Sequence, residues 1–384
     1  MTTILLVLLI NAAILIYPSA AVSSARDGLL LWFNSVLPAL LPFAVMIGVL
    51  NALGFTRFLG VLLEPVMRAV FRLPGVAGFA FVMGCMAGAP MGAKLTAELR
   101  ADGAISKNEA RRLSAFSGCA GPLFVVGAVG VGVFESAWVG YFVYMAHILG
   151  ALAVGVLLRG FGKKETAAHA DRQRILTIAS AKMDAERAKH GGFGQILGRS
   201  VMSSMETMLL VGGFIVIFSV IIGLVFRIFD GYAGALPDGN IAKAVFAGFI
   251  EISSGTRGLS EAEGRIALVA AAGIVSWGGL CIHAQSAAFL GKTDAGSGIY
   301  ILGKTLHAAF AVGFALLLYP LFVMISERRG GVVQAAAREV TVIPNLSMPP
   351  VWQSVILFAV SFVALVVVSL VVYLITKPRK GVTR

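Results

Sequence analysis

The chain has 384 residues, of which 58% are apolar and only 13% are charged. Soluble domains usually carry about a quarter charged residues, so this composition excludes a water-soluble enzyme, a disordered chain and a fibrous protein. Only lipid solvates so much apolar surface, and we therefore expect an all-α, polytopic membrane protein. The formal charge of +12 is typical of cytoplasmic loops that follow the positive-inside rule, and we expect no nucleic-acid partner.

Eight apolar stretches are long enough to cross a bilayer as helices, which takes about 20 residues. They are 4–22, 35–55, 108–134, 138–160, 205–229, 263–290, 298–325 and 352–376. No basic residue precedes the first stretch, so it is predicted to be a transmembrane helix and not a signal peptide. Segments 24–37 and 57–72 are short and amphipathic, and we expect both to lie in the membrane interface.

Two further apolar stretches, 74–100 and 241–259, are interrupted in the middle by Gly, Pro or Ser. Irregular backbone at membrane depth is tolerated only where it lines a cavity or is buried in protein. The two stretches are therefore predicted to be re-entrant hairpins, each with a half-helix, a tight turn and a second half-helix. We expect the tips of these hairpins at Gly88–Gly92 and Ser253–Gly255.

The third and sixth spans are interrupted as well, at Ser117–Pro122 and Ser276–Gly279. Unwound stretches of this kind supply ligand groups in transporters. The order of span, hairpin, broken span and span thus occurs twice, which predicts two repeats over 35–160 and 205–325. We expect the hairpin tips and the broken spans to meet around one midplane cavity.

The distribution of Lys and Arg predicts the topology. The basic linker 161–204 is expected in the cytoplasm together with 57–72 and 100–112, and the nearly uncharged segment 230–240 is expected outside. The first hairpin then enters from the cytoplasm and the second from outside, so the two repeats are predicted to be inverted.

The ends of the chain complete the predicted domain organisation. Residues 1–34 are expected to form a transmembrane helix and an interfacial segment, and 326–384 an outer loop, a last transmembrane helix and a cytoplasmic tail. Both termini are then cytoplasmic in a multi-pass protein of the cell membrane. The outer position of 326–350 conflicts with its Arg328, Arg329 and Arg338.

Several motifs argue against catalysis and cofactors. Gly298–Thr305 matches the Walker A pattern, but it opens a membrane span and has no preceding strand, so we interpret it as a chance match. The cysteines Cys85, Cys119 and Cys281 form no CxxC pair, which predicts neither a disulfide framework nor a metal site. We expect no cofactor and no enzymatic activity.

Polar residues inside the apolar segments are the candidate functional groups. Glu251 stands in an apolar half-helix, where a carboxylate is costly, and it is predicted to be functional; the alternative is a structural pair with Arg257. Lys94 either snorkels to the surface or holds an anion beside the half-helix ends. His283 follows an unwound stretch and is an open choice between cavity lining and structure. Buried, hydrogen-bonded structural roles are the default expectation for His147 and His307.

Long motifs carry a family resemblance. Gly88–Leu95, Ile105–Leu113, Ala120–Gly132 and Gly278–Gln285 resemble the YlbJ/SpoVV sporulation integral membrane proteins, which belong to the nucleoside-recognition Gate group. That group is similar to concentrative nucleoside transporters and to the membrane part of ferrous-iron permeases. The resemblance implies a transporter with two inverted, hairpin-containing repeats. It also implies a link to the movement of dipicolinic acid, a pyridine dicarboxylate, during spore formation.

These observations favour a carrier for a small, anionic solute, with Glu251 as the coupling residue for a proton or sodium ion. Half-helix N-termini at the hairpin tips would offer free N–H groups to the anion. The predicted substrate-binding residues are Gly88, Pro90, Gly92, Lys94, Ser117, Cys119, Gly121, Ser253, Ser254, Gly255, Ser276, Gly278, His283 and Gln285. The alternatives are a nucleoside or ion permease of the same fold and a non-transporting membrane scaffold or sensor in sporulation. A homo-oligomer is compatible with each of them.

Overall fold

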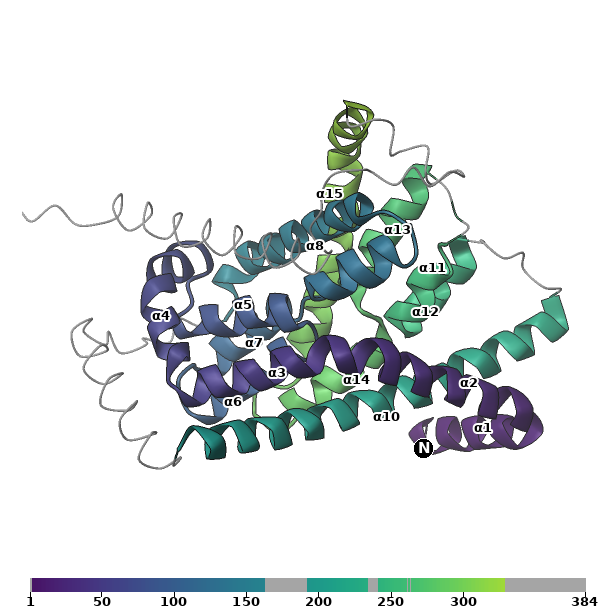
Figure 1. The fold of residues 1–384 in the computed structure, drawn as a ribbon, viewed down its shortest axis with the longest axis horizontal. Coiled ribbons are helices and arrows are strands. Elements are labelled where there is room, and N and C mark those ends of the chain that lie inside the picture. The colour runs from purple at the N-terminus through teal and green to yellow at the C-terminus, as the bar shows by residue number, and fades with distance from the viewer. Residues whose placement is uncertain (1, 163–191, 234–240, 261, 263, 329–384) are drawn as a thin grey trace, which may run out of the picture.

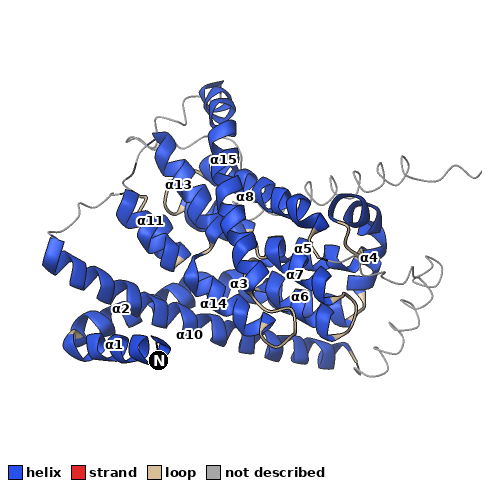
Figure 2. Ribbon diagram, turned by 180° about the vertical axis from the view of Figure 1, so that it is seen from behind, coloured by secondary structure: helices blue, strands red, loops and turns tan. Residues whose placement is uncertain are grey.

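The computed structural model describes the chain except residues 1, 163–191, 234–240, 261, 263 and 329–384, and the described residues form helices and loops without strands (Figures 1 and 2). In the first half the helices are α1 (Thr2–Ile16), α2 (Pro18–Leu31), η1 (Trp32–Val36), α3 (Leu37–Ala52), α4 (Phe55–Val66), η2 (Met67–Phe71), α5 (Val76–Ala87), α6 (Met91–Ala101), α7 (Lys107–Ser117), η3 (Leu123–Val131), α8 (Ala137–Leu157) and η4 (Leu158–Gly160). In the second half they are α10 (Phe193–Ala233), α11 (Ile241–Ile250), α12 (Ile252–Arg257), α13 (Gly264–Trp277), α14 (Gly279–Leu290) and α15 (Gly298–Arg328).

The all-α membrane class is confirmed. Within the described ranges, four helices are long and apolar enough to cross a membrane, or up to six if two bent helix pairs each count as one span. The predicted spans 138–160 and 298–325 correspond to α8 with η4 and to α15. The predicted span 352–376 and the linker residues 163–191 lie outside the described residues.

The prediction of one straight span over 4–22 is wrong. α1 and α2 meet at an angle of 104°, because Pro18 has no N–H for a continuing helix and forces Tyr17 out of helical geometry. Residues 24–37 are not a separate helix, since α2 runs through the π-helical turn η1 directly into α3, and their position in the membrane interface stays a prediction.

α2 and α3 lie side by side with α10 along one edge of the molecule (Figure 1). Small residues allow this approach: a Cβ added at Gly48 would stand 3.1 Å from the Ser200 side chain. Across the same contact, the indole of Trp32 donates a 3.0 Å hydrogen bond to the Met208 carbonyl. α10 begins at Phe193, earlier than the predicted start at residue 205, so part of the predicted linker is helical.

Both interrupted stretches form pairs of short helices. α5 and α6 pack against each other and are joined by Gly88–Pro90. α11 and α12 also pack together, and Gly255 approaches Gly248 so closely that any side chain at Gly255 would collide with the Gly248 backbone. The second turn falls at Glu251, so the prediction of a tip at Ser253–Gly255 is wrong by a few residues.

The two broken spans are confirmed as broken helices. The first is interrupted between α7 and η3, where residues 118–121 are non-helical and Pro122 lacks an N–H. The second is interrupted between α13 and α14, where Gly278 and Gly279 have φ values of +85° and +81°. Such left-handed backbone is accessible to glycine without strain, which explains the position of the break.

Basic residues gather at one end of the helices. Arg100 forms two hydrogen bonds of 2.8 and 2.9 Å to Asp294, and Arg111 donates to the Ala295 carbonyl at 3.0 Å. The hydrogen bonds from Arg100 hold the pKa of Asp294 below its usual range. The stabilisation that this contact gives to the folded state is therefore fully present above the unfolded pKa of about 3.9. It is lost as the pH falls through the lowered pKa of Asp294.

The same end collects the other loops that are predicted to be cytoplasmic. Arg112 donates to the carbonyls of Arg159, at 2.7 Å, and Arg72, at 3.1 Å. At the opposite ends of α8 and α15, an apolar cluster joins the second hairpin to the turn before α8, through residues that include Phe134, Leu259 and Phe322. The two hairpins therefore have their open ends at opposite ends of the helices.

This arrangement predicts which loops share a side of the membrane. Single cysteines at the exposed positions Asp102 and Lys292 are expected to react with a membrane-impermeant maleimide from one side, and a cysteine at Glu135 from the other. The wild type is the background control, since Cys119 and Cys281 are buried and Cys85 is partly buried. Labelling of all three introduced cysteines from the same side would contradict the arrangement.

Candidate functional site

Side chains from α8 and α15 satisfy the backbone groups that the first break frees. The Lys304 ammonium donates a 2.8 Å hydrogen bond to the Gly118 carbonyl, and the Ala120 N–H donates a 2.9 Å hydrogen bond to Nε2 of His147. Lys304 is 1% exposed and His147 is 0% exposed. Buried polar side chains therefore bind backbone groups of the break, as irregular backbone within a membrane protein requires.

His147 connects the first break to the second. Because its Nε2 accepts from a backbone N–H, the ring is neutral with its proton on Nδ1, and Nδ1 donates to the Ser276 hydroxyl at 2.9 Å. Ser276 lies on α13, immediately before the second break. One side chain thus joins both broken helices in the middle of the fold.

Lys304 extends this network through a second histidine. Nε2 of His307 faces the His147 carbonyl at 2.8 Å and must donate to it, which leaves Nδ1 to accept from the Lys304 ammonium at 3.2 Å. The two imidazole rings stack with centroids 4.5 Å apart. Both imidazoles are neutral in this network, so Lys304 is its cationic group.

Lys304 forms no ion pair with a carboxylate in the described part of the chain, where the ion pairs are Arg68–Glu64 and Arg100–Asp294. The acidic groups that it interacts with are the thiols of Cys119 and Cys85. A buried charge without a counter-ion costs several kcal/mol, and burial of this kind marks ligand or ion pathways in membrane proteins. The Walker A pattern that contains Lys304 opens the membrane helix α15, and the described residues before it form no strand.

Aromatic rings form a wall beside Lys304. The His283 ring lies 4.1 Å from the Trp277 ring and 5.4 Å from the Tyr300 ring, measured between centroids, and its Nε2 lies 3.0 Å from the Trp277 carbonyl. Tyr300 packs on Gly118, where an added Cβ would come within 3.2 Å of the ring. The hydroxyls of Tyr300 and Ser286 are buried neighbours that interact with each other, and neither has another hydrogen-bond partner in the described chain.

The hairpin turns contact the breaks, as predicted. A Cβ added at Gly88 would lie 3.1 Å from the Gly121 nitrogen, and Gly92 packs directly on the Ser117 carbonyl. In the second half of the chain, a Cβ at Gly279 would lie 3.0 Å from the Glu251 backbone. We call the assembly of both breaks, both turns, His147, Lys304, His307, His283 and Tyr300 the central cluster. A cavity within the central cluster stays a prediction.

Glu251 has a structural role that the sequence analysis did not foresee. Its carboxylate is 2% exposed and accepts the N–H groups of Ser253 at 2.9 Å and Ser254 at 2.8 Å, which caps α12. The expectation of free N–H groups at the second hairpin tip is therefore wrong, and Glu251 forms no ion pair with Arg257 in the described chain. The N-terminus of α12 is occupied by Glu251 and is not open to an anion.

Two other predicted residues lie away from the central cluster. Lys94 donates to the hydroxyls of Ser203 and Thr207 on α10, because it occupies the face of α6 opposite Gly92. The Gln285 amide contacts the Cys281 sulfur at 3.3 Å within α14. The remaining predicted residues lie at the turns and breaks: Pro90 precedes α6, Cys119 contacts the Phe116 carbonyl, and Gly278 forms the second break.

The comparisons with known proteins agree with this architecture. The model of the Gate family, described as nucleoside recognition, matches residues 33–137, which contain the first hairpin and the first break. The chain is 39% identical to the sporulation integral membrane protein YlbJ of Bacillus subtilis strain 168, over 82% of this chain and 82% of that protein. The chain belongs to the YlbJ family of sporulation integral membrane proteins. No solved structure matches it.

In this YlbJ-family chain, sequence reasoning missed Lys304 and Tyr300 as site residues and gave His147 and His307 structural roles. The available signal was a lysine in the interior of the span 298–325, since an ionisable residue inside a membrane helix is a functional candidate. The sequence analysis considered Lys304 only as part of a chance Walker A match and did not weigh it as a binding residue. The described residues include no group of three or more His, Cys, Asp or Glu side chains placed to hold a metal ion.

Proposed function

We propose that the chain is a membrane carrier for a small anionic solute that binds in the central cluster. The observation that carries the proposal is the buried ammonium of Lys304, which has only a carbonyl and an imidazole nitrogen as partners in the described chain. A bound carboxylate would supply its missing counter-charge. The neighbouring hydroxyls of Tyr300 and Ser286, which have only each other as partners in the described chain, are further donors for such an anion.

An aromatic carboxylate is the solute class that these surroundings favour. The rings of Trp277, His283 and Tyr300 offer flat apolar surfaces next to the ammonium. Dipicolinic acid combines one aromatic ring with two carboxylates, and the resemblance to the sporulation proteins points to the same molecule. We therefore propose dipicolinate as the substrate.

The placement of the two hairpins supports an alternating-access mechanism. Their open ends lie at opposite ends of the helices, and each turn contacts the broken helix of its own repeat. Two inverted repeats of this kind, similar to those of concentrative nucleoside transporters, would expose the central cluster first to one side and then to the other. In this proposal the basic end faces the cytoplasm.

Uptake by the purified full-length protein in liposomes tests the proposal. Labelled dipicolinate is expected to accumulate, and unlabelled uridine or Fe²⁺ is expected not to compete. Competition by uridine or by Fe²⁺ would favour the nucleoside or ion permease instead. No uptake of any of the three, from protein that is folded and monodisperse, would favour the scaffold.

We keep Glu251 as the proposed coupling residue. Because Glu251 also caps α12, substitutions there are expected to lower stability as well as coupling. Glu251→Gln keeps one acceptor oxygen for the N–H groups of Ser253 and Ser254, so it is expected to fold and bind the solute but to lose the pH or sodium dependence of uptake. Glu251→Ala removes the cap and is expected to lower stability by about 1–2 kcal/mol. An unchanged pH and sodium dependence in Glu251→Gln would exclude the coupling role.

A further inference from the structure

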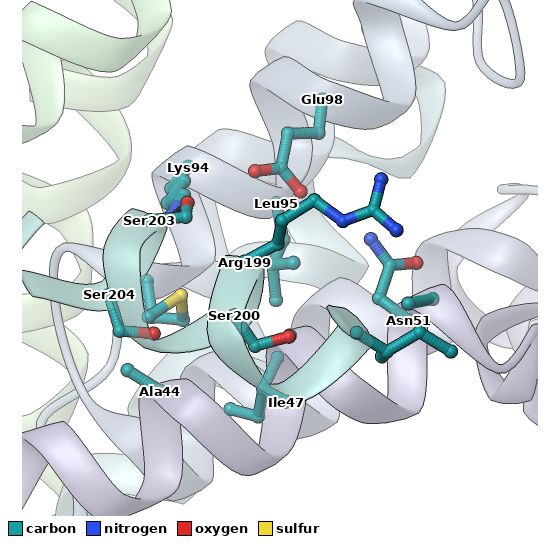
Figure 3. Close-up of a pocket in the computed structure, with 14 residues that line it drawn as sticks. Ala44, Ile47, Asn51, Lys94, Leu95, Glu98, Arg199, Ser200, Ser203 and Ser204 are labelled. Carbon is teal, nitrogen blue, oxygen red and sulfur yellow. Dashed lines mark hydrogen bonds between the residues drawn. The ribbon is translucent and has the colours of Figure 1, made fainter. Parts of the chain in front are cut away.

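A second cationic site lies outside the central cluster, in a cavity between α3, α6 and α10 (Figure 3). The cavity measures about 200 Å³, and we call it the α10 cavity. Its polar lining includes Lys94, Glu98, Arg199, Ser200, Ser203 and Ser204. Figure 3 shows Lys94 beside Ser203, with Ser200 and Ser204 on neighbouring turns of α10.

Lys94 is held in this cavity by neutral groups. Its ammonium donates to the hydroxyls of Ser203 at 3.2 Å and Thr207 at 3.0 Å, while the Thr207 hydroxyl itself donates to the Ser203 carbonyl at 2.8 Å. An ammonium has three donors, and the third finds no acceptor among the described residues. No described carboxylate lies within ion-pair distance of Lys94, and Glu98, one turn later in α6, interacts with it over a longer distance.

The ammonium and the hydroxyls of the lining favour an anion. Lys94 stands among the hydroxyls of Ser200, Ser203 and Ser204, and the lining also includes Arg199 and one carboxylate, that of Glu98. Hydroxyl donors beside an ammonium are the groups that bind a carboxylate with charge-assisted hydrogen bonds. The opposite wall is apolar and includes Ala44 and Ile47, which suits the ring of an aromatic carboxylate.

α6 separates the α10 cavity from the central cluster. Lys94 lies on the cavity face of the helix, whereas Ala93 packs against Tyr300 on the other face. On that second face, the Thr96 hydroxyl lies 3.3 Å from the Ser117 hydroxyl, directly before the first break. A solute in the α10 cavity is therefore one helix away from Lys304.

We propose that the α10 cavity is a second carboxylate site, in which Lys94 and the hydroxyls of α10 hold the transported anion before it passes α6 to reach Lys304. This inference rests on the proposed function. It assigns Lys94 to a site of its own, separate from the hairpin tips and the breaks.

Equilibrium binding of labelled dipicolinate to the purified full-length protein tests the two sites separately. The wild type is expected to bind two molecules per chain, Lys94→Gln and Lys304→Met one each, and the double variant none. Ser203→Ala keeps the charge of Lys94 and is expected to weaken the α10 site by less than Lys94→Gln, which should weaken it at least tenfold. Lys292→Gln removes an exposed lysine elsewhere and is the matched control.

The outcomes distinguish this inference from the proposed function. Equal stoichiometry and affinity in the wild type and Lys94→Gln would overturn the α10 site, and so would a wild type that binds no dipicolinate. If Lys304→Met binds as the wild type does while Lys94→Gln loses binding, the central site fails and the α10 site stands.

Discussion

Lys304→Met is expected to abolish solute uptake while the thermal stability of the protein stays equal or rises. Methionine has a similar length and fills the same buried space, and replacing a buried, uncompensated charge with an apolar side chain is often neutral or stabilising by about 1–4 kcal/mol. The Gly118 carbonyl and the His307 ring lose a donor, which limits the gain. Uptake in liposomes and thermal unfolding in detergent measure the two effects on one preparation.

The opposite signs of the two effects separate a ligand-binding lysine from a structural one. A structural lysine would lower stability and uptake together, whereas a binding lysine lowers uptake alone. Lys292→Met is the control, because Lys292 is exposed on the loop after α14. Uptake by Lys304→Met within a factor of two of the wild type would contradict the role of Lys304.

His147→Ala is expected to cause the largest loss of stability among the variants of the central cluster. It leaves the Ala120 N–H and the Ser276 hydroxyl buried without their partner and opens a cavity beside His307. Each unsatisfied buried group costs about 1–3 kcal/mol, so the two together cost roughly 2–6 kcal/mol. A fall in the thermal unfolding temperature, with loss of uptake, is the expected result.

Two conservative variants separate the two hydrogen bonds of His147. An asparagine amide reaches the position of Nδ1 and retains the contact with Ser276, whereas a glutamine amide reaches the position of Nε2 and retains the contact with Ala120. Each is expected to be more stable than His147→Ala. In a double-mutant cycle with Ser276→Ala, the coupling energy is expected to be large for His147→Gln, which loses the contact with Ser276, and near zero for His147→Asn, which keeps it. Equal coupling in both variants would show that His147 does not bridge the breaks.

Hydropathy and helix-breaking residues predicted most of the fold. Long apolar stretches predicted α8 and α15, and Gly and Pro inside such stretches predicted both hairpin turns and both broken helices. These signals are local: a missing N–H at Pro122 or a left-handed backbone at Gly278 acts within one helical turn. The bend at Tyr17–Pro18 follows from the same rule. The prediction of one span over 4–22 rested on hydropathy and did not take Pro18 into account.

The central cluster could not be predicted from the sequence, because it is formed by contacts between distant segments. The hydrogen bond from Lys304 to Gly118 and the one from His147 to Ser276 depend on how helices pack, which periodicity within one helix does not specify. Glu251 shows the converse case. Its hydrogen bonds to the N–H groups of Ser253 and Ser254 follow a local helix-capping pattern. The prediction for Glu251 weighed only the cost of a carboxylate inside the membrane and did not include this cap.

The most direct test of the account is an experimental structure of the full-length protein with dipicolinate bound. The account predicts ligand density in the central cluster, with a carboxylate within hydrogen-bonding distance of the Lys304 ammonium and the Tyr300 hydroxyl, and with the ring beside Trp277 and His283. Ligand density that avoids Lys304, or a central cluster that stays closed at saturating dipicolinate, would contradict it.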